Sequence, residues 1–542
     1  MRSITTLFLL GPSILFAQNT FQRLVLADYA YGRAVATTPG GDVLVAGDEL
    51  DFVTGQYSAP VIKYTAAGAF LWNAHVFLPA IGGFSNTTVD ALAATSGGGA
   101  LITGQFDTDF DPDSIYVAEL DATGALLWSK RFEPAVVAVV EVRTTNVIEA
   151  PNGDVLVCGE IATDAGQLQD DAYLSRFDTD GTHLWTKHIV APVASTFNRT
   201  GAIILPSTGG ILLAGQTTLF SEGSWLMMLD DGGTLQWVKK YALGGGVLDE
   251  PPVGLSETST GYVVYYSTVF GADSIPLFRI ATDLSGNATG AWSYQVQSGA
   301  LSLVNDVAAL SGGGHLVTGN NVYTLPTYNI QAFMMKLDVA GTVLWANEYG
   351  TNGAETGEGG DATSDGGFLM AGSGQEDSLA FSGGDERGGV PVDMYLVKAD
   401  GNGNSGGCET PMPVMVNTET FSSSPYTQNL TSIIGWSTMA FSTGGNYAES
   451  SACIDQGVLD LSSAGPLDAY PNPTSGVITI ELPVGGEWRH ALIDATGRIL
   501  IQFTKQGEER SDLDLRDMPS GRYVLRSTNA TSLHHTPVMV IH

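Results

Sequence analysis

The residues Gly-Gly-His-Leu-Val-Thr-Gly at positions 313–319 and Leu-Asp-Val-Ala-Gly-Thr-Val-Leu-Trp at positions 337–345 form a phrase that recurs along the 542-residue chain. Imperfect copies of its Gly-Gly turn lie near residues 41, 99, 153, 210, 261, 314 and 367. Its Trp recurs at residues 72, 128, 185, 237, 292 and 345, so both series advance by 51 to 58 residues. A repeat of this length decides the architecture before any residue-level chemistry is considered.

Each copy predicts four β-strands. The Gly-Gly turn joins two strands, the second of which is a short apolar run typical of a strand buried on both faces. An Asp-x-x-Gly turn then separates a third strand from a fourth that carries Leu-Trp. Helical periodicity is almost absent. Seven such units predict an all-β fold, a seven-bladed β-propeller over residues 18–405.

The two ends of the repeat array predict a closed ring. The seventh copy stops near Gly401 and never reaches its Leu-Trp strand. Residues 21–26, before the first Gly-Gly turn, look like a strand that belongs to no copy. We expect this segment to complete the last blade, because the pairing would cover two sheet edges at once.

The repeat resembles that of bacterial surface and secreted propellers, whose blades carry Gly-Gly-x-x-x-x-Gly and Asp-x-x-Gly-x-x-x-Trp. The resemblance covers roughly residues 21–405. It implies the fold and leaves the activity open, because propellers host many unrelated functions. The recurring Trp residues are expected to pack blade against blade; sugar stacking is the alternative.

The chain is strongly acidic, with 57 Asp and Glu against 23 Lys and Arg and a formal charge of −34. Nucleic acid and anionic membrane surfaces both need concentrated basic residues, so neither is an expected partner. Residues 1–17 predict a secretory signal peptide cut between Ala17 and Gln18. No later stretch is long enough to predict a transmembrane anchor, and we expect the propeller to be monomeric.

Three cysteines suit an exported protein that does not depend on disulfides. Cys158 lies in a predicted strand and is expected to be a buried thiol. Cys408 and Cys453 flank the Ser-, Thr- and Pro-rich stretch within residues 406–467, which predicts a connecting segment. The two could pair in an oxidising compartment or remain free thiols.

Residues 468–542 predict a small β-sandwich of short alternating strands with Asp, Gly and Pro turns. Three motifs follow one another there: Tyr470-Pro471-Asn472-Pro473, Asp494-x-x-Gly497-Arg498 and Gly521-x-Tyr523. Together they resemble the C-terminal sorting domain of the type IX secretion system of Bacteroidetes. The resemblance implies translocation across the outer membrane by that machinery, followed by release or surface attachment. One departure is that the last strand lacks the Lys that the family often carries.

Candidate chemistry is sparse. The alternating carboxylates Asp107, Asp109, Asp111 and Asp113 could gather around Ca²⁺, but they lack the Gly and the distant Glu of an EF-hand loop, and a solvated turn is the favoured alternative. No other cofactor is expected. Acidic residues recur in the predicted loops between second and third strands, for example Asp48 and Asp171, and make that face the expected contact surface. His315 follows a Gly-Gly turn and is expected to be a turn residue.

Three functions remain open. The leading hypothesis is a non-enzymatic exported propeller that binds protein or glycan at or outside the cell surface. The alternatives are a secreted glycan-active hydrolase or lyase, which would need paired carboxylates in the central channel, and a structural adhesion or matrix component.

Overall fold

The computed structural model describes residues 20–541 except 27–29, 52–55, 77–84, 109–110, 133–140, 163–169, 191–196, 219–222, 244–250, 268–276, 297–300, 324–328, 351–353, 375–391, 408, 420, 426–428, 433–435, 439–447, 452–466, 468, 483–486, 494–498, 507–509, 517 and 529–532. The predicted signal peptide and its cleavage site at Ala17 and Gln18 therefore lie outside the described residues. The described part consists of strands, turns and irregular segments, without a helix.

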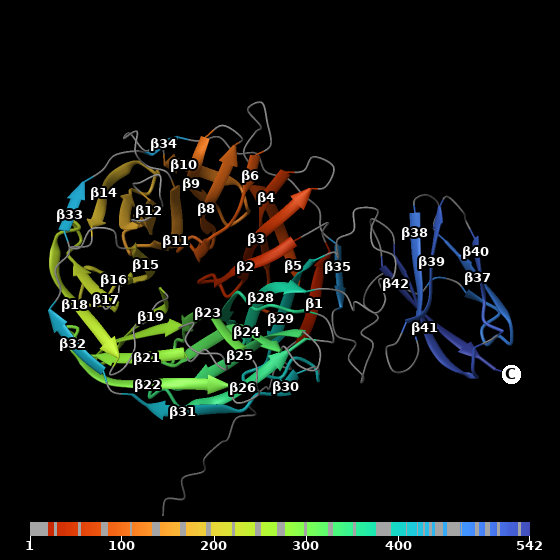
Figure 1. The fold of residues 1–542 in the computed structure, drawn as a ribbon. Coiled ribbons are helices and arrows are strands. Elements are labelled where there is room, and N and C mark those ends of the chain that lie inside the picture. Colours follow the sequence, from red (N-terminus) through yellow and green to blue (C-terminus); the bar gives the residue numbers. More distant parts are fainter. Residues whose placement is uncertain are drawn as a thin grey trace, which may run out of the picture.

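Seven antiparallel blades surround a central axis (Figure 1). The strands of each blade are given from the axis outward. Blade 1 contains β2 (Ala30–Thr37), β3 (Val43–Asp51), β4 (Gln56–Tyr64) and β5 (Phe70–Val76), and blade 2 contains the interrupted inner pair β6 (Ser85–Thr87) and β7 (Ala91–Ala94), then β8 (Ala100–Thr108), β9 (Asp111–Leu120) and β10 (Leu126–Phe132). Blade 3 contains β11 (Glu141–Glu149), β12 (Val155–Ala162), β13 (Asp170–Phe177) and β14 (His183–Val190), and blade 4 contains β15 (Phe197–Ile204), β16 (Ile211–Thr218), β17 (Gly223–Leu229) and β18 (Leu235–Leu243).

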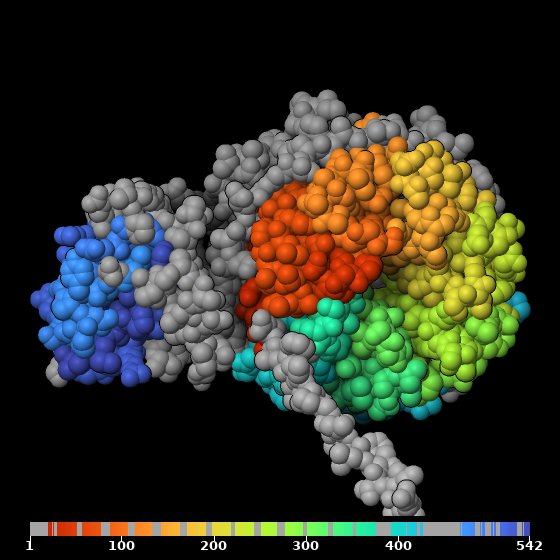
Figure 2. Space-filling view, turned by 180° about the vertical axis from the view of Figure 1, so that it is seen from behind, coloured from red at the N-terminus to blue at the C-terminus, as the bar shows by residue number. Residues whose placement is uncertain are grey.

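Blade 5 contains β19 (Pro252–Thr258), β20 (Gly261–Ser267), β21 (Leu277–Thr282) and β22 (Ala288–Val296). Blade 6 contains β23 (Leu301–Ala309), β24 (His315–Tyr323), β25 (Asn329–Leu337) and β26 (Val343–Tyr349). Blade 7 contains β27 (Gly359–Ala362), β28 (Phe368–Gly374), β29 (Asp393–Ala399) and β1 (Phe21–Leu26). Each inner strand contacts the next, and β27 contacts β2, so the ring is closed. Figure 2 shows the blades following one another around the ring in chain order.

The N-terminal strand closes blade 7, as the sequence predicts. β1 pairs antiparallel with β29, from Phe21 opposite Lys398 to Val25 opposite Met394. The Val25 side chain is fully buried, and Gln22 is 1% exposed. First and last blades are thereby joined by a strand from the opposite end of the chain.

The recurring Trp residues pack between blades, as predicted. At five seams, the glycine of an Asp-x-x-Gly turn lies against the Trp of the preceding blade: Gly124 on Trp72, Gly181 on Trp128, Gly233 on Trp185, Gly286 on Trp237 and Gly403 on Trp345. At the closing seam, Phe21 takes the place of Trp and contacts Gly68. These glycines have positive φ and no side chain, and both properties are needed where a turn meets an indole ring.

A pair of glycine substitutions should separate these two requirements. Gly181 has φ +73°, and a Cβ there would overlap the Trp128 ring, whereas Gly209 has φ +89° and open space around it. Gly181→Ala should lower the free energy of unfolding by about 2–3 kcal/mol. Gly209→Ala introduces backbone strain alone and should lower the free energy of unfolding by about 1 kcal/mol. Equal losses in urea denaturation would contradict the role assigned to the Trp contact.

A belt of six short strands runs around the outside of the ring, and sequence analysis missed it. These strands extend the blades in reverse order: β30 (Glu409–Pro411) on blade 6, β31 (Val414–Thr418) on blade 5, β32 (Phe421–Pro425) on blade 4, β33 (Asn429–Ser432) on blade 3, β34 (Trp436–Thr438) on blade 2 and β35 (Ala448–Ser451) on blade 7. Several of them lie on the rim in Figure 1. Residues 406–467 were expected to be a connecting segment only; this is corrected, because 409–451 supply a fifth strand to six blades.

The C-terminal residues form two sheets with a core of their own. One sheet contains β36 (Ala469–Tyr470), β37 (Val477–Glu481) and β40 (Arg510–Asp514). The other contains β39 (Ile499–Gln506), β38 (Glu487–Ile493), β41 (Gly521–Thr528) and β42 (Leu533–Val540) in that order. Apolar side chains of both sheets, among them Ile480, Trp488 and Leu525, form one buried cluster. This is the small β-sandwich that the sequence predicts.

Candidate functional site

Charged side chains on or next to the first two strands of three neighbouring blades lie close enough to interact. We call Arg33, Asp48, Asp90 and Glu358, from blades 1, 2 and 7, the channel cluster. The Arg33 Nε donates to Asp48 Oδ2 at 2.7 Å, and the Val89 backbone N–H of blade 2 donates to Asp48 Oδ1 at 2.7 Å. Asp48 is 3% exposed. The expectation that it belongs to an open acidic loop is therefore wrong.

Burial decides the protonation chemistry of this cluster. It raises the pKa of Asp48, against the opposing effect of Arg33, and it also raises the pKa of Glu358. Burial raises the pKa of Asp90 to about 6, although the Thr144 hydroxyl donates to its carboxylate at 2.6 Å. The cluster therefore contains three buried carboxyl groups that accept hydrogen bonds from neighbouring donors, together with the guanidinium group of Arg33.

Two carboxylates on inner strands also accept hydrogen bonds from backbone N–H groups of the neighbouring blade. The Gly360 N–H of blade 7 donates to Asp306 of blade 6 at 3.1 Å. The Thr37 N–H of blade 1 donates to Asp361 of blade 7 at 2.8 Å. Buried acceptors of this kind bind one blade to the next. In each of these two contacts, one carboxylate oxygen accepts a backbone N–H of the neighbouring blade.

Asp306 should make the stability of the ring depend on pH. Burial, together with the nearby Asp361 carboxylate, raises its pKa to about 7, compared with about 3.9 in the unfolded chain. A raised folded-state pKa stabilises the ring fully below about pH 4, and this stabilisation is lost as the pH rises to about 7. The loss is on the order of 3 kcal/mol. Urea denaturation between pH 4.5 and 7.5 measures it.

The matched variant is Asp306→Asn, because Asn146 occupies the corresponding position after the bulge of blade 3. The Asp306→Asn variant should lose less unfolding free energy between pH 4.5 and 7.5 than the wild type does, and its free energy of unfolding at pH 7.5 should be higher. Asp180→Asn, at an exposed turn, controls for the loss of one negative charge. An unchanged pH slope in Asp306→Asn would contradict the assignment.

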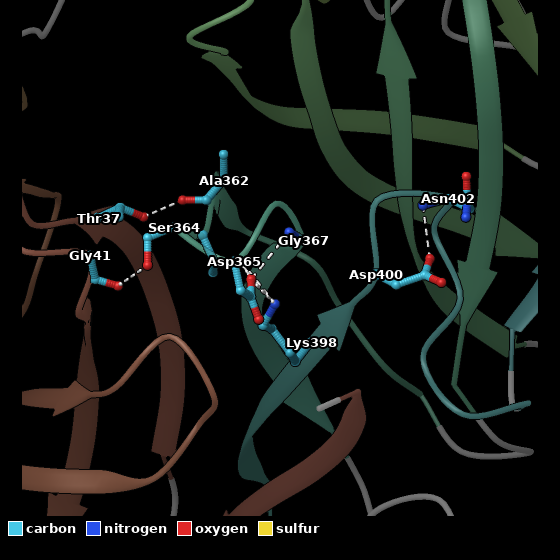
Figure 3. Close-up of polar contacts among 10 residues, drawn as sticks. Thr37, Gly41, Ala362, Ser364, Asp365, Gly367, Lys398, Asp400 and Asn402 are labelled. Carbon is cyan, nitrogen blue, oxygen red and sulfur yellow. Dashed lines mark hydrogen bonds and ion pairs between the residues drawn. The ribbon is translucent and has the colours of Figure 1, made fainter. Parts of the chain in front are cut away.

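Cations on the third strands also tie the blades together. Lys63, Arg176, Arg279 and Lys336 each donate to a backbone carbonyl oxygen in a turn of the next blade. Figure 3 shows the corresponding residue of blade 7, Lys398, donating to Asp365 at 2.8 Å beside the contact between Ser364 and Gly41 of blade 1. These five basic residues of the third strands therefore have structural roles.

In the Asp-x-x-Gly turns, the Asp carboxylate accepts hydrogen bonds from backbone N–H groups of its own turn. Asp400 accepts the backbone N–H of Asn402 at 2.8 Å (Figure 3) and that of Asn404 at 2.9 Å. The same pattern at Asp121 and Asp283 lowers the pKa of each carboxyl group, mainly through hydrogen bonds to its own turn. These carboxylates stabilise turns and are not arranged as metal ligands.

His315 lies in a buried polar chain at the seam between blades 5 and 6. Its Nε2 is 2.7 Å from Ser256 Oγ, and its Nδ1 is 2.9 Å from the Tyr265 hydroxyl oxygen. The geometry resembles that of a nucleophilic dyad, but His315 is 2% exposed and burial lowers its pKa to about 4. Such a neutral, weakly basic imidazole suits packing. The expectation of a turn residue is wrong, because His315 begins β24.

The predicted calcium ligands lie at the tip of one hairpin. Asp107 is in β8, and Asp111 and Asp113 are in β9, while Asp109 lies outside the described residues. Among the residues that the structure describes, no group of three or more His, Cys, Asp or Glu is placed to hold a metal ion. Cys408, Cys453, Asp494, Gly497 and Arg498 also lie outside the described residues.

Within the C-terminal sandwich, described motif residues tie strands together. The Asn472 amide donates to the Pro537 carbonyl oxygen at 2.6 Å and accepts the Met539 N–H at 2.9 Å, which fixes the Tyr470-Pro471-Asn472-Pro473 segment to β42. The Tyr523 hydroxyl donates to the Pro519 carbonyl oxygen at 2.7 Å, next to Gly521. These residues therefore have a structural role inside the domain.

Comparison with known families agrees with this division. Residues 468–542 match the family described as the secretion system C-terminal sorting domain. The chain is a β-propeller protein that carries a type IX secretion sorting domain, and this domain implies interaction with the type IX machinery and secretion beyond the cell.

Several solved structures are similar at low identity. A protein of unknown function from Dyadobacter fermentans is 10% identical, with a TM-score of 0.38, and the match covers 70% of this chain and 98% of that one. The β-propeller domain of the Trilobed protease from Pyrococcus furiosus is 10% identical (TM-score 0.25; 60% and 94% covered). The WD40 domain of SCAP from fission yeast is 8% identical (TM-score 0.33; 75% and 94% covered). No curated protein matches the chain. In the described part, no helix could cross a membrane.

Proposed function

We propose that this protein is an exported, non-enzymatic propeller that binds a protein or glycan outside the cell. The observation that carries the proposal is the contrast between the two kinds of acidic residue. Asp48 and Asp306 are buried and hydrogen-bonded across seams. Asp107, Asp109, Asp111 and Asp113 form a run of four alternating carboxylates that no other copy of the repeat carries. A function specific to this chain is best sought among the residues that do not repeat.

The contact surface we propose is the face at which the second strand of each blade ends and the third strand begins. The β8–β9 hairpin brings Asp107, Asp111 and Asp113 to this face, and β3 ends there at Asp51. Loops carried by a rigid scaffold are common sites of recognition. Calcium at the hairpin tip is part of the same proposal, because alternating carboxylates supply oxygen ligands. Fractionation of cells distinguishes release into the medium from retention on the outer surface.

The test is capture of surface proteins and glycans by residues 18–465, which contain the complete ring and belt. Asp107→Asn/Asp111→Asn/Asp113→Asn should abolish capture while leaving thermal unfolding unchanged. Asp180→Asn/Asp231→Asn, on the opposite face, is the control. Equal capture by both variants would refute the assigned face. Turnover of a polysaccharide would instead favour the hydrolase or lyase, and self-assembly without any ligand would favour a matrix component.

A further inference from the structure

Charge is divided unevenly between the sorting domain and the rest of the chain. Residues 468–542 contain nine Asp and Glu and seven Lys and Arg, which gives a formal charge of −2 and leaves −32 on residues 1–467. Six of the seven basic residues are arginines, and Arg is enriched where proteins bind one another. A partner with acidic groups would be repelled by the rest of the chain and can approach the sorting domain.

The described arginines of this domain form two groups. In the three-stranded sheet, Arg510 Nη2 lies 3.1 Å from Glu481 Oε1, and Arg516, which follows β40, is also in an ion pair. Arg522 and Arg526 belong to β41 of the four-stranded sheet, drawn in blue in Figure 1. In the described part of the chain, no carboxylate lies within ion-pair distance of either guanidinium group. Their charges are therefore available to a partner.

The burial pattern of β41 places both arginines on one face. Leu525 and Ser527 are fully buried, whereas Arg522 is exposed and Val524 and Arg526 are partly exposed. Successive side chains of a strand point to opposite faces of its sheet, so the second set lies on the outer face. Four residues along a strand span about 13 Å, which is the separation of the two arginine Cα atoms.

The neighbouring strand supplies apolar side chains to the same face. In the register of β41 and β42, Pro537 lies opposite Val524, and Met539 lies opposite Arg522. Pro537 is exposed and Met539 is partly exposed. Apolar groups between two cations match the composition of a protein interface, with an apolar centre and a polar rim. We give the name arginine face to Arg522, Val524, Arg526, Pro537 and Met539.

The motif residues of the domain are engaged in its own fold. The Asn472 side chain is bonded to the backbone of β42 in both directions. Tyr523 is 7% exposed, and its hydroxyl donates to Pro519. A partner that docks on the folded domain therefore has to contact other side chains, and the arginine face offers charged groups that the fold does not use.

We propose that the arginine face binds an acidic, partly apolar protein surface of the type IX secretion machinery. The sorting domain implies an interaction with that machinery, and the proposal assigns the interaction to these residues. Two carboxylates about 13 Å apart on the partner would reach both guanidinium groups, and Arg binds carboxylates in a planar, bidentate geometry. This inference goes beyond the proposed binding function of the propeller and does not depend on its ligand.

Two other occupants fit the face less well. Each Arg near an anionic lipid surface strengthens binding on the order of fivefold, so two of them add roughly thirtyfold, against repulsion of the remaining −32. A second copy of the domain would bring its own arginines to the contact, because a twofold interface uses the same patch on both subunits. An acidic protein surface meets neither obstacle.

Export of the full chain by a host with type IX machinery tests the arginine face. Arg522→Gln/Arg526→Gln should lower the exported fraction of the protein on the order of tenfold, because both charged anchors are lost. Arg510→Gln/Arg516→Gln removes the same charge from the other sheet and should change this fraction less than about twofold. Arg522→Lys/Arg526→Lys keeps the charge and should lie between them. Equal export of the two Gln variants would overturn the proposal.

Cross-linking in cells makes the test independent of how the arginine variants fold. A photoreactive amino acid in place of Val524 should form an adduct with a component of the machinery, through a peptide that contains Asp or Glu. The same group in place of Asp512, exposed on β40, should give on the order of tenfold less. Equal yields from the two positions would contradict the assignment.

Two further outcomes would give the face to another occupant and overturn the proposal. One is an adduct of the Val524 position with a second copy of the chain alone. The other is binding of the full chain to vesicles of phosphatidylethanolamine and phosphatidylglycerol that Arg522→Gln/Arg526→Gln abolishes. Ligand capture by the propeller is not part of any of these readouts, so failure of the proposed function leaves the test intact.

Discussion

Deletion of residues 20–26 should open the ring and remove its cooperative unfolding transition. β1 is paired on both edges, with β29 of blade 7 inside and β35 of the belt outside. The deletion removes the fully buried Val25 and two rows of backbone hydrogen bonds. Together these contribute on the order of 5 kcal/mol or more. Urea denaturation followed by Trp fluorescence measures the loss, and size-exclusion chromatography should show an expanded or associated protein.

Two comparisons make this result specific to ring closure. Arg23→Gln keeps the backbone pairing of β1. It removes the hydrogen bond from the guanidinium to the Gly68 carbonyl oxygen at 2.8 Å and the stacking of the guanidinium 3.9 Å above the Phe21 ring, and should cost about 1 kcal/mol. A synthetic peptide of residues 20–28, added to the deletion protein, should bind and restore the transition. A deletion protein that melts like the full chain would show that blade 7 closes without β1.

Removal of the belt should turn the propeller into an aggregating protein. Truncation after Gly407 would expose the outer edges of β10, β14, β18, β22, β26 and β1, which the belt strands cover. Uncovered edge strands present unpaired N–H and C=O groups to other chains. We expect residues 18–407 to form oligomers at micromolar concentration and to lose several kcal/mol of stability.

Residues 18–465 are the matched control, since they keep the belt and omit the sorting domain. This longer protein should be monomeric in light scattering, as expected for the propeller. The shorter one should elute as a broad, concentration-dependent mixture. Two sharp monomer peaks would mean that the belt is dispensable for keeping the propeller monomeric.

Most of the fold could be predicted because it repeats. Gly-Gly and Asp-x-x-Gly turns mark strand ends through backbone geometry, and the unfinished seventh copy points to closure by residues 21–26. The belt could not be predicted in the same way. Its strands have three to five residues and are rich in Ser, Thr and Pro, so they lack the alternation of a half-buried strand. Their pairing depends on edges supplied by residues far away in the chain.

The candidate site was less predictable, for a physical reason. Asp48 and Asp171 looked like members of an exposed acidic surface, yet Asp48 pairs with Arg33, and Asp171, 2% exposed, lies 3.0 Å from the His188 ring. Burial of a charged residue depends on a partner brought by another strand, which local sequence does not reveal. The cations of the third strands did carry a signal, because they recur immediately before the last residue of the strand in most copies.

The belt also relates the circumference of the ring to a length of chain. Its strands on blades 6, 5, 4, 3 and 2 start at residues 409, 414, 421, 429 and 436, so neighbouring blades are served by five to eight residues each. A duplication that inserted an eighth blade would leave this segment too short to reach blade 7, and the loss of a blade would leave it slack. Blade number and belt length must therefore change together during evolution, which resists the gain and loss of copies otherwise common among repeat proteins.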